Sequence, residues 1–323
     1  MTLDPQQLFV LLAIARHGSF GRAAIALGQS QPTLSNNIAL LERRLGVKLL
    51  ERSRRGSKLT AHGEILVRRT EGIAAILNDA ESEVQNLDTA IAGPLRVGAT
   101  PGALPTLLPQ TLARLGSVPG ARIVEVVEGL DQALTHDLRT GRLDIFVGPV
   151  RENLTGHSDI VEHVLLEDPF CIAVPPDNAL ADRDCIQLNE LGDAQWVLPR
   201  EGSTYRRHVE AMFLTAGVPW PAHAVYANSL PLLEAMIASG EYVTFVSPLQ
   251  LRFPVAGFRV LRLDYGSRRA IGYKVRRSAK PSHLADRFVD LLIDVADEIA
   301  RNPAFVQLGG RGRTGLAGAD ATE

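Results

Sequence analysis

Side chains suited to contact nucleic acid are concentrated between residues 18 and 63 of this 323-residue chain. The segment reads as a short helix, a tight turn, a second helix and a basic hairpin, which are the parts of a winged helix-turn-helix. Such a unit places one helix in the major groove of DNA and a basic loop against the phosphates. Amides such as Asn36 and Asn37 can pair with adenine, whereas Arg54 and Arg55 offer charge to the backbone.

The second of these helices is predicted over residues 31–45, between Ser30 as N-cap and Gly46 as its end. Its apolar stripe consists of Leu34, Ile38, Leu41 and Leu45. The residues that we expect to contact DNA are Ser30, Gln31, Pro32, Thr33, Ser35, Asn36, Asn37, Arg52, Arg54 and Arg55. Two alternatives stay open: Ser30 is only a helix cap, and Arg54 and Arg55 are only solvated charges on a turn.

The distribution of charge supports a nucleic-acid partner. Residues 1–60 hold nine basic and three acidic side chains and therefore carry +6, so the remainder must carry −8 to give the net charge of −2. A basic head on an acidic body is typical of a nucleic-acid-binding module joined to another domain.

Composition places the chain among globular proteins with two or three domains. Apolar residues make up 46% and charged residues 22%, and no run of 18 apolar residues occurs, so we expect no membrane partner. The N-terminus has neither a basic start nor a small-residue cleavage site, which predicts a folded helix in a cytoplasmic protein and not a signal peptide. Two cysteines, Cys171 and Cys185, fit a reducing compartment.

Caps and periodicity predict the order of elements. Helices are expected at 5–17, 20–27, 31–45, 105–115, 132–140, 206–215, 231–238 and 284–299. Strands are expected at 48–51, 58–60, 95–99, 122–127, 144–148, 170–174, 195–198, 222–227, 242–246 and 269–276. From residue 95 onward the two alternate, which indicates parallel sheets covered on both faces and divided into two lobes.

A long helix is predicted from Thr60 to Ile91. Its apolar positions keep steps of four and three over more than three heptads, at Leu66, Thr70, Ile73, Leu77, Ala80, Val84, Leu87 and Ile91. This pattern is typical of a coiled-coil seam, so we expect the helix to pair with a second copy. The alternative is one amphipathic helix that packs on its own domain.

Residues 18–63 resemble the DNA-binding domain of LysR-type transcriptional regulators. Five motifs occur in order: Gly18-Ser19-Phe20 with Ala23-Ala24, Ser30-Gln31 through Ser35, Leu41-Glu42 through Leu45-Gly46, Leu49-Leu50-Glu51-Arg52, and Leu59-Thr60-Ala61-His62-Gly63. Leu50 replaces the usual Phe, which is a change in the core. Asn36-Asn37 replaces the common Arg-Gln, which should alter the DNA sequence that is read and not the ability to bind.

The resemblance implies an α/β protein with an N-terminal winged helix-turn-helix, a long linker helix and a two-lobed, type 2 periplasmic-binding-protein-like effector domain. It implies homotetramers built from dimers, and lobes joined by two crossings near 165–168 and 263–268. The expected divisions are 1–60, the linker at 61–92, the effector domain at 93–306 and a disordered tail at 307–323. Lobe I is expected at 93–166 and 267–306, and lobe II at 167–266. Expected partners are operator DNA, a small-molecule effector, further copies of the chain and RNA polymerase.

Hydroxyl groups at predicted starts of helices suggest where an effector binds. Thr100 follows the first strand of lobe I, and Gly202, Ser203 and Thr204 hold the equivalent place in lobe II. Helix N-termini that face each other across a cleft favour an anionic ligand, although these residues can also be N-caps only. Further candidates at ends of strands or beside these residues are Pro101, Gly102, Glu128, Pro149, Arg200, Asn228 and Ser247. Arg200 can instead pair with Glu201.

Other patterns exclude alternative functions. Gly310 to Gly315 matches G-x-G-x-x-G but neither follows a strand nor opens a helix, so no dinucleotide cofactor is expected. No metal spacing, P-loop or nucleophile–base pattern is present, which argues against an enzyme. A solute-binding receptor would need a signal peptide and no DNA-binding head. Cys171 reads as a core residue, whereas Cys185, beside Arg183 and Asp184, is a conceivable redox-reactive thiol.

Overall fold

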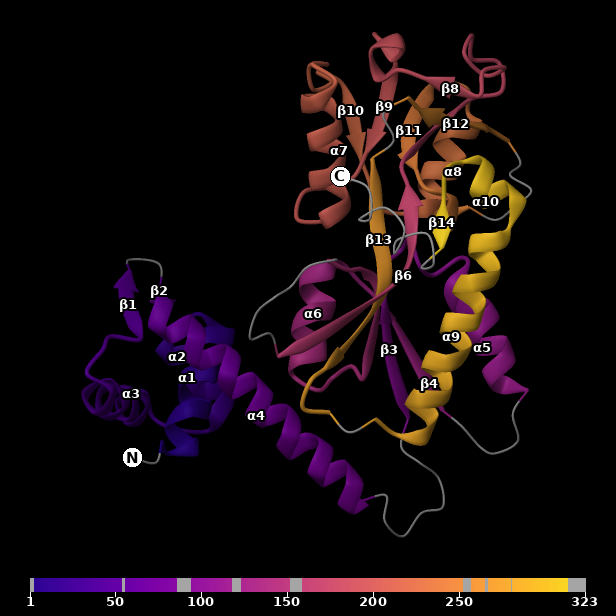
Figure 1. Ribbon diagram of the computed structural model, residues 1–323. Helices are drawn as coiled ribbons and strands as arrows, with labels where there is room; N and C mark the ends of the chain where they lie inside the picture. The colour runs from indigo at the N-terminus through magenta and orange to yellow at the C-terminus, as the bar shows by residue number, and fades with distance from the viewer. Residues whose placement is uncertain are drawn as a thin grey trace, which may run out of the picture. The chain divides into compact units, whose positions relative to one another are not determined.

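The computed structural model describes residues 3–53, 56–85, 94–117, 123–151, 159–251, 257–264, 267–279 and 281–312. They form two compact units, and the main boundary between them follows Gln85. Figure 1 labels the helices and strands of each unit. Within the described ranges, no single helix has both the length and the apolar character to cross a membrane. The bent pair of the first two helices passes that test by length and composition alone.

Three short helices, each with its own cap, build the N-terminal unit: α1 (Pro5–His17), α2 (Phe20–Leu27) and α3 (Gln31–Leu45). The side chains of Asp4, Ser19 and Ser30 each accept a hydrogen bond from a backbone N–H in the first turn, so all three predicted N-caps are confirmed. Leu11 and Leu34 are fully buried where the helices meet. Leu45, expected in the apolar stripe of α3, is instead exposed because it lies in the last turn of the helix.

A β-hairpin and a long helix complete the unit. Strands β1 (Leu50–Ser53) and β2 (Gly56–Leu59) pair antiparallel, closer to the turn than the sequence predicts. Helix α4 (Ala61–Gln85) follows, and the Thr60 hydroxyl accepts a hydrogen bond from the N–H of Gly63 at 3.1 Å. The same hydroxyl donates to the carbonyl of Lys48 at 2.7 Å, which fixes the start of α4 beside the hairpin. Thr60 therefore caps the start of α4, as the sequence predicts.

The predicted seam of α4 is largely uncovered within its own chain. Ile73, Leu77 and Val84 expose 38%, 53% and 74% of their surface, whereas Thr70 is buried. Ala80 is exposed, whereas Leu66 is half-buried against the core of the N-terminal unit. Leu87 and Ile91 lie outside the described residues. An uncovered apolar row on a long helix agrees better with pairing than with packing on its own domain.

The C-terminal unit is built on two six-stranded sheets. The first has the order β14-β6-β13-β5-β3-β4. Its strands are β3 (Leu95–Ala99), β4 (Val124–Glu128), β5 (Ile145–Pro149), β6 (Ile160–Pro169), β13 (Arg268–Arg276) and β14 (Arg311–Gly312). Helices α5 (Leu107–Gly116), α9 (His283–Arg301) and α10 (Pro303–Gln307) share a core with Val97 and Val147. Helix α6 (Asp131–Arg139) packs with Phe146, which points to the opposite face because side chains alternate along a strand.

The second sheet has the order β10-β9-β11-β7-β12-β8. Its strands are β7 (Cys171–Val174), β8 (Cys185–Ile186), β9 (Gln195–Leu198), β10 (Ala224–Tyr226), β11 (Tyr242–Val246) and β12 (Arg259–Leu263). Helix α7 (Thr204–Thr215) packs with Trp196 and Phe245, whereas α8 (Leu230–Ala238) packs with Ala173 and Val246 on the other face. Two short 3-10 turns, Leu188–Leu191 and Pro248–Gln250, complete the described elements of this part.

The expectation of parallel sheets is confirmed only in part: β3 runs parallel to β4 and β5, and β9 runs parallel to β10 and β11. Strand β13 runs antiparallel to both β5 and β6, and β7 runs antiparallel to β11 and β12. For β6 and β13 the reason is their connection: the chain leaves the first sheet along β6 and returns to it along β13, so these two paired strands run in opposite directions. Figure 1 shows the two strands side by side, continuing toward the second sheet. Because β6 stays paired as far as Pro169, the first crossing falls at Phe170, slightly later than the predicted boundary at 166.

Residues 307–312, predicted to belong to a disordered tail, are ordered in the structure. The prediction of a disordered tail from residue 307 is wrong for residues 307–312, because Arg311 and Gly312 pair with Glu167 and Leu166 of β6. Residues 313–323 lie outside the described residues. A glycine-rich segment can thus remain ordered where an adjacent strand offers free backbone groups.

Candidate DNA interface and ligand cleft

Helix α3 presents its predicted polar residues away from the core. Leu34, Ile38 and Leu41 are buried, whereas Gln31, Pro32, Thr33 and Asn36 are exposed and Ser35 and Asn37 are half-buried. The Ser30 hydroxyl, which caps the helix, accepts from the N–H of Thr33 at 3.3 Å and shares a 2.7 Å hydrogen bond with its hydroxyl. The exposed residues therefore lie together on the face that a groove of DNA would meet.

The hairpin supplies the second predicted contact. Arg52 lies in β1 opposite Ser57 of β2, but the description does not extend to its side chain. Arg54 and Arg55 fall outside the described residues, so their assignment as phosphate contacts stays a prediction.

A buried carboxylate that the sequence analysis missed joins α3 to the hairpin. Glu42 accepts hydrogen bonds from the backbone N–H groups of Leu49 at 2.9 Å and Leu50 at 3.3 Å, and it pairs with the Lys48 ammonium at 2.5 Å. Burial alone would raise the pKa of Glu42, but these partners favour the ionised form more strongly and the pKa is lowered from 4.5. The sequence feature that could have indicated this role is the position of Glu42 in the Leu41-Glu42 motif.

We expect Glu42→Gln to destabilise the N-terminal unit by about 1–3 kcal/mol, because an amide loses the ion pair and matches two N–H donors less well. Because the folded-state pKa is depressed, the carboxylate contributes stability above pH 4.5, and this stability is lost as the pH falls through the folded pKa. Chemical denaturation at neutral and acidic pH measures both effects. Equal stability of wild type and variant at neutral pH would contradict this role.

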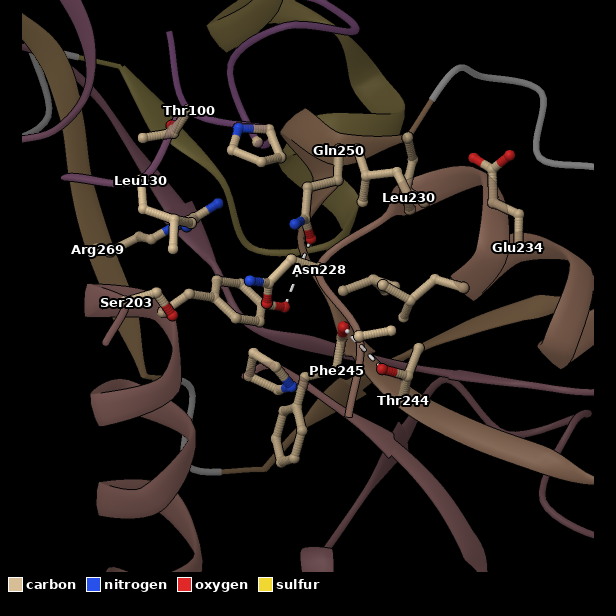
Figure 2. A pocket seen from close by; sticks show the side chains of 18 of the residues that line it. Thr100, Leu130, Ser203, Asn228, Leu230, Glu234, Thr244, Phe245, Gln250 and Arg269 are labelled. Atoms are coloured by element: carbon tan, nitrogen blue, oxygen red, sulfur yellow. Dashed lines mark hydrogen bonds between the residues drawn. The ribbon is translucent and has the colours of Figure 1, made fainter. Parts of the chain in front are cut away.

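A cleft pocket lies at the carboxyl ends of β3 and β5 and reaches toward α7 and α8. Its empty volume is about 840 Å³, including space open to solvent. Six of the predicted effector residues line it: Thr100, Pro101, Gly102, Pro149, Ser203 and Asn228. Five do not: Glu128, Arg200, Gly202, Thr204 and Ser247. Figure 2 shows Thr100 and Arg269 toward one end of the pocket and Leu230 and Glu234 toward the other.

Thr100 has the strongest mark of a ligand contact. It exposes only 7% of its surface, and its hydroxyl finds no hydrogen-bond partner within the described part of the chain. The expectation that Thr100 stands at the start of a helix is wrong, because α5 begins only at Leu107 after a run of turns. Its hydroxyl is consequently not consumed by a cap and remains available to a ligand.

The start of α7 already holds a carboxylate of the protein itself. Ser203 caps the helix by accepting from the N–H of Arg206 at 3.0 Å, and the N–H of Thr204 donates to Asp131 Oδ2 at 3.2 Å. Asp131 belongs to α6 beside the first sheet, so this hydrogen bond links the two lobes. An anionic ligand would meet this carboxylate, and the expectation of an anion at this helix end therefore loses its physical support.

The remaining predicted residues have other surroundings. The backbone N–H of Arg200 donates to Asn228 Oδ1 at 3.0 Å, so these two residues join the loops that follow β9 and β10. Gly202 adopts a φ of +90°, which favours glycine, and Glu128 is exposed at the end of β4. Asn228 lines the pocket, whereas Arg200, Gly202 and Glu128 do not.

A buried ion pair at the crossing strands was also missed. Arg269 donates to Asp168 Oδ2 through Nε at 3.1 Å and Nη2 at 2.8 Å, and Nη2 also donates to the Ser247 hydroxyl at 3.0 Å. Burial raises the pKa of Asp168, and Arg269 opposes that shift. The guanidinium also lies over the ring of Tyr205, 5.0 Å from its centroid. Ser247 is therefore a partner of Arg269, which itself lines the pocket.

The two cysteines of the chain lie elsewhere in the second sheet. Cys171 is buried, donates its thiol to the carbonyl of Leu308 at 3.8 Å, and has its pKa raised to about 12 by burial. Cys185 is half-buried in an outer strand. Neither is among the described residues that line the cleft pocket. Cys171 is therefore a core residue, as predicted.

The sequence and the fold match one known family. The pattern described as "Bacterial regulatory helix-turn-helix protein, lysR family" matches residues 5–64, and that described as "LysR substrate binding domain" matches residues 89–297. The chain is 29% identical over 248 residues to the DNA-binding transcriptional dual regulator OxyR of Escherichia coli, covering 76% of this chain and 80% of the relative. It is 31% identical over 240 residues to a probable hydrogen peroxide-inducible genes activator of Streptomyces viridosporus, covering 74% and 76%.

Solved full-length structures share the architecture. A full-length OxyR variant from Pseudomonas aeruginosa is similar with a TM-score of 0.55 and 26% identity, covering 92% of this chain and 95% of that one. CbnR, a LysR family transcriptional regulator, matches with a TM-score of 0.56 and 20% identity, covering 91% and 99%, which supports the fold alone. The chain therefore belongs to the LysR family: it is a DNA-binding transcription regulator with an effector-binding domain, and not an enzyme.

Proposed function

We propose that this regulator reads operator DNA with the exposed residues of α3 and holds the phosphates with the hairpin. The observation that carries the proposal is the arrangement of α3, whose apolar side is buried while Gln31, Thr33 and Asn36 remain exposed. The basic charge of residues 1–60 supports it. Because DNA is the partner, we infer that the protein acts in the bacterial cytoplasm, where RNA polymerase is a further expected partner.

Binding of labelled genomic fragments at several salt concentrations tests this proposal. If six or more phosphates are contacted, affinity should fall about a thousandfold between about 50 and 200 mM salt. Asn36→Ala should relax the base preference at one position of each half-site at a cost of about 1–3 kcal/mol, and the exposed Asn189→Ala should change nothing. Equal affinity for all fragments and for random DNA would rule out sequence-specific binding.

We propose that a small-molecule effector in the cleft pocket controls this DNA binding. The buried hydroxyl of Thr100, which has no hydrogen-bond partner among the described residues, supports a ligand at that end. There the N–H of Thr204 in one lobe donates to Asp131 of the other. A ligand that contacts both lobes shifts the balance between lobe arrangements by its difference in affinity for them. Several relatives, including those of Streptomyces viridosporus and Dickeya chrysanthemi, are named hydrogen peroxide-inducible genes activators. Neither Cys171 nor Cys185 is among the described residues that line the cleft pocket. We therefore propose that a bound ligand, and not oxidation of a cysteine in the cleft, controls this chain.

We propose that α4 pairs with the same helix of a second chain, and that such dimers join into tetramers. In this proposal residues 1–60 form the DNA-binding head, 61–92 the pairing helix and 93–306 the effector domain. The uncovered row of Ile73, Leu77 and Val84 supports the pairing.

Leu77→Asp should split the dimer, because it would bury an unpaired charge in the seam at a cost of several kcal/mol. Ile65→Asp is the matched control: Ile65 is similarly exposed, at 51%, but lies off the seam. Sedimentation velocity should show smaller assemblies only for Leu77→Asp, together with weaker operator binding. Unchanged sedimentation of Leu77→Asp would mean that α4 does not pair through this row.

A further inference from the structure

The cleft pocket has two chemically different ends. One, the polar end, is formed by Thr100 and Asp131, which follow the neighbouring parallel strands β3 and β4. The other, the apolar arm, extends beneath α8. Its lining side chains are Leu230, Leu233, Ile237, Val246, Leu251 and Phe258. Figure 2 shows the labelled residues of the two ends on opposite sides of Gln250 and Asn228.

The apolar arm exists because α8 packs incompletely on its sheet. The helix reads LPLLEAMIA, yet only Ile237 among its residues is buried. Leu230, Leu233 and Ile237 fall on one helical face by their spacing, and all three line the pocket. Of these, Ile237 also packs with Val246 of β11. An unfilled apolar space is unfavourable in a folded protein, so an apolar group of a ligand would bind there readily.

The polar end holds two buried oxygens that lack partners. Thr100 Oγ1 and Asp131 Oδ1 make no hydrogen bond within the described ranges, although Asp131 Oδ2 accepts from Thr204. An ionised carboxylate oxygen needs a donor, and a threonine hydroxyl can both donate and accept. Because Thr100 and Asp131 follow neighbouring strands and line the same pocket, a ligand hydroxyl placed between them could donate to Asp131 and accept from Thr100.

The charge of the lining disfavours a carboxylate in this position. Its acidic and basic residues are Asp131, Glu234 and Arg269, and the guanidinium of Arg269 is already matched by Asp168. The charge left for a ligand is therefore negative. A ligand carboxylate near Asp131 would be repelled at short range in a largely buried site.

We infer that the effector is an uncharged, hydroxyl-bearing amphiphile, with its hydroxyl between Thr100 and Asp131 and its apolar chain or ring beneath α8. This inference rests on the proposed control of the regulator by a ligand in the cleft. An uncharged effector replaces the anionic effector that the predicted helix N-termini suggest. The reason is that the N-terminus of α7 already binds the carboxylate of Asp131.

Matched pairs of alcohols and carboxylates test the head group. Benzyl alcohol, phenylethanol and phenylpropanol are compared with benzoate, phenylacetate and phenylpropionate by calorimetry on the full chain at neutral pH. Each alcohol should bind about tenfold or more tightly than its carboxylate, the ratio that about 1.4 kcal/mol produces. Asp131→Asn removes the negative charge at constant shape, so the affinities of each alcohol and its matched carboxylate should then differ by less than about threefold. Thr100→Val should weaken the alcohols.

Two substitutions on α8 test the apolar arm. Leu233→Phe should fill the arm and abolish the gain in affinity from benzyl alcohol to phenylpropanol that we expect in the wild type. Leu232→Phe is the matched control, since Leu232 is 46% exposed and does not line the pocket. Its affinities should equal those of the wild type.

Three results would overturn the inference. Tighter binding of the carboxylates, a series unaffected by Leu233→Phe, or no binding of any alcohol each excludes a hydroxyl-bearing amphiphile in this pocket. Carboxylate binding that Thr100→Val abolishes would leave the cleft as the effector site and reject only the ligand class. Loss of the proposed DNA-binding function would appear separately, in the fragment-binding assay.

Discussion

Replacing Asp168 with alanine should destabilise the C-terminal unit by about 3–5 kcal/mol, because it leaves the Arg269 guanidinium buried without a counter-ion. Asp168 has no exposed surface and Arg269 only 6%, so water cannot replace the lost carboxylate. The residues are direct partners across β6 and β13, the two strands that join the sheets. Chemical denaturation of the full chain, followed by the fluorescence of Trp196 and Trp220 in the second sheet region, measures the loss.

A double variant separates the charge from the packing. Asp168→Leu with Arg269→Met removes both charges while keeping apolar volume, and such replacements are often neutral or stabilising. We expect the double variant to recover most of the stability that Asp168→Ala loses. It should nevertheless bind ligand poorly, since Arg269 lines the pocket. A double variant as unstable as Asp168→Ala would show that the site depends on packing and not on an unpaired charge.

The second large effect is expected at Gly63, where α4 passes the start of the hairpin. A Cβ at this position would lie 2.2 Å from the backbone carbonyl oxygen of Leu49, far inside a normal contact. Gly63→Ala must therefore displace either α4 or the segment that Glu42 holds, at a cost of about 1–3 kcal/mol or more. Because that segment leads into the hairpin, operator affinity should fall as well.

Gly72 on the same helix offers the matched control. A Cβ added there meets nothing within 4 Å, so Gly72→Ala should stabilise α4 by about 0.5–1 kcal/mol. Thermal denaturation and fragment binding of the two variants should change in opposite directions. Similar behaviour of both would mean that the N-terminal unit tolerates a shift of α4 against Leu49.

Local signals determined much of the fold. Asp4, Ser19 and Ser30 each accept from an N–H two or three residues ahead, so their helices could be located from neighbouring residues alone. The order of buried strands and amphipathic helices was readable for the same reason, since each pattern is complete within one element. The five short motifs likewise placed the winged helix-turn-helix.

Strand β6 shows where local signals end. Its sequence, IVEHVLLEDP, carries charged residues that do not read as a buried strand. Glu162 and Asp168 are accommodated because Lys274 and Arg269 of β13 lie opposite them. These partners are about a hundred residues away, so only the pairing of the crossing strands reveals that the charges are compensated.

The sequence by itself determined the family, the DNA-binding head and the cleft that Thr100 and Ser203 share. Only the tertiary structure decided the chemistry of that cleft. It showed that Asp131 reaches the N-terminus of α7 from 73 residues away, and that the Thr100 hydroxyl has no partner in the part of the chain that the structure describes. The physical reason is that a cap or a helical stripe is a contact between near neighbours, whereas the charge and shape of a pocket depend on which distant segments the topology brings together.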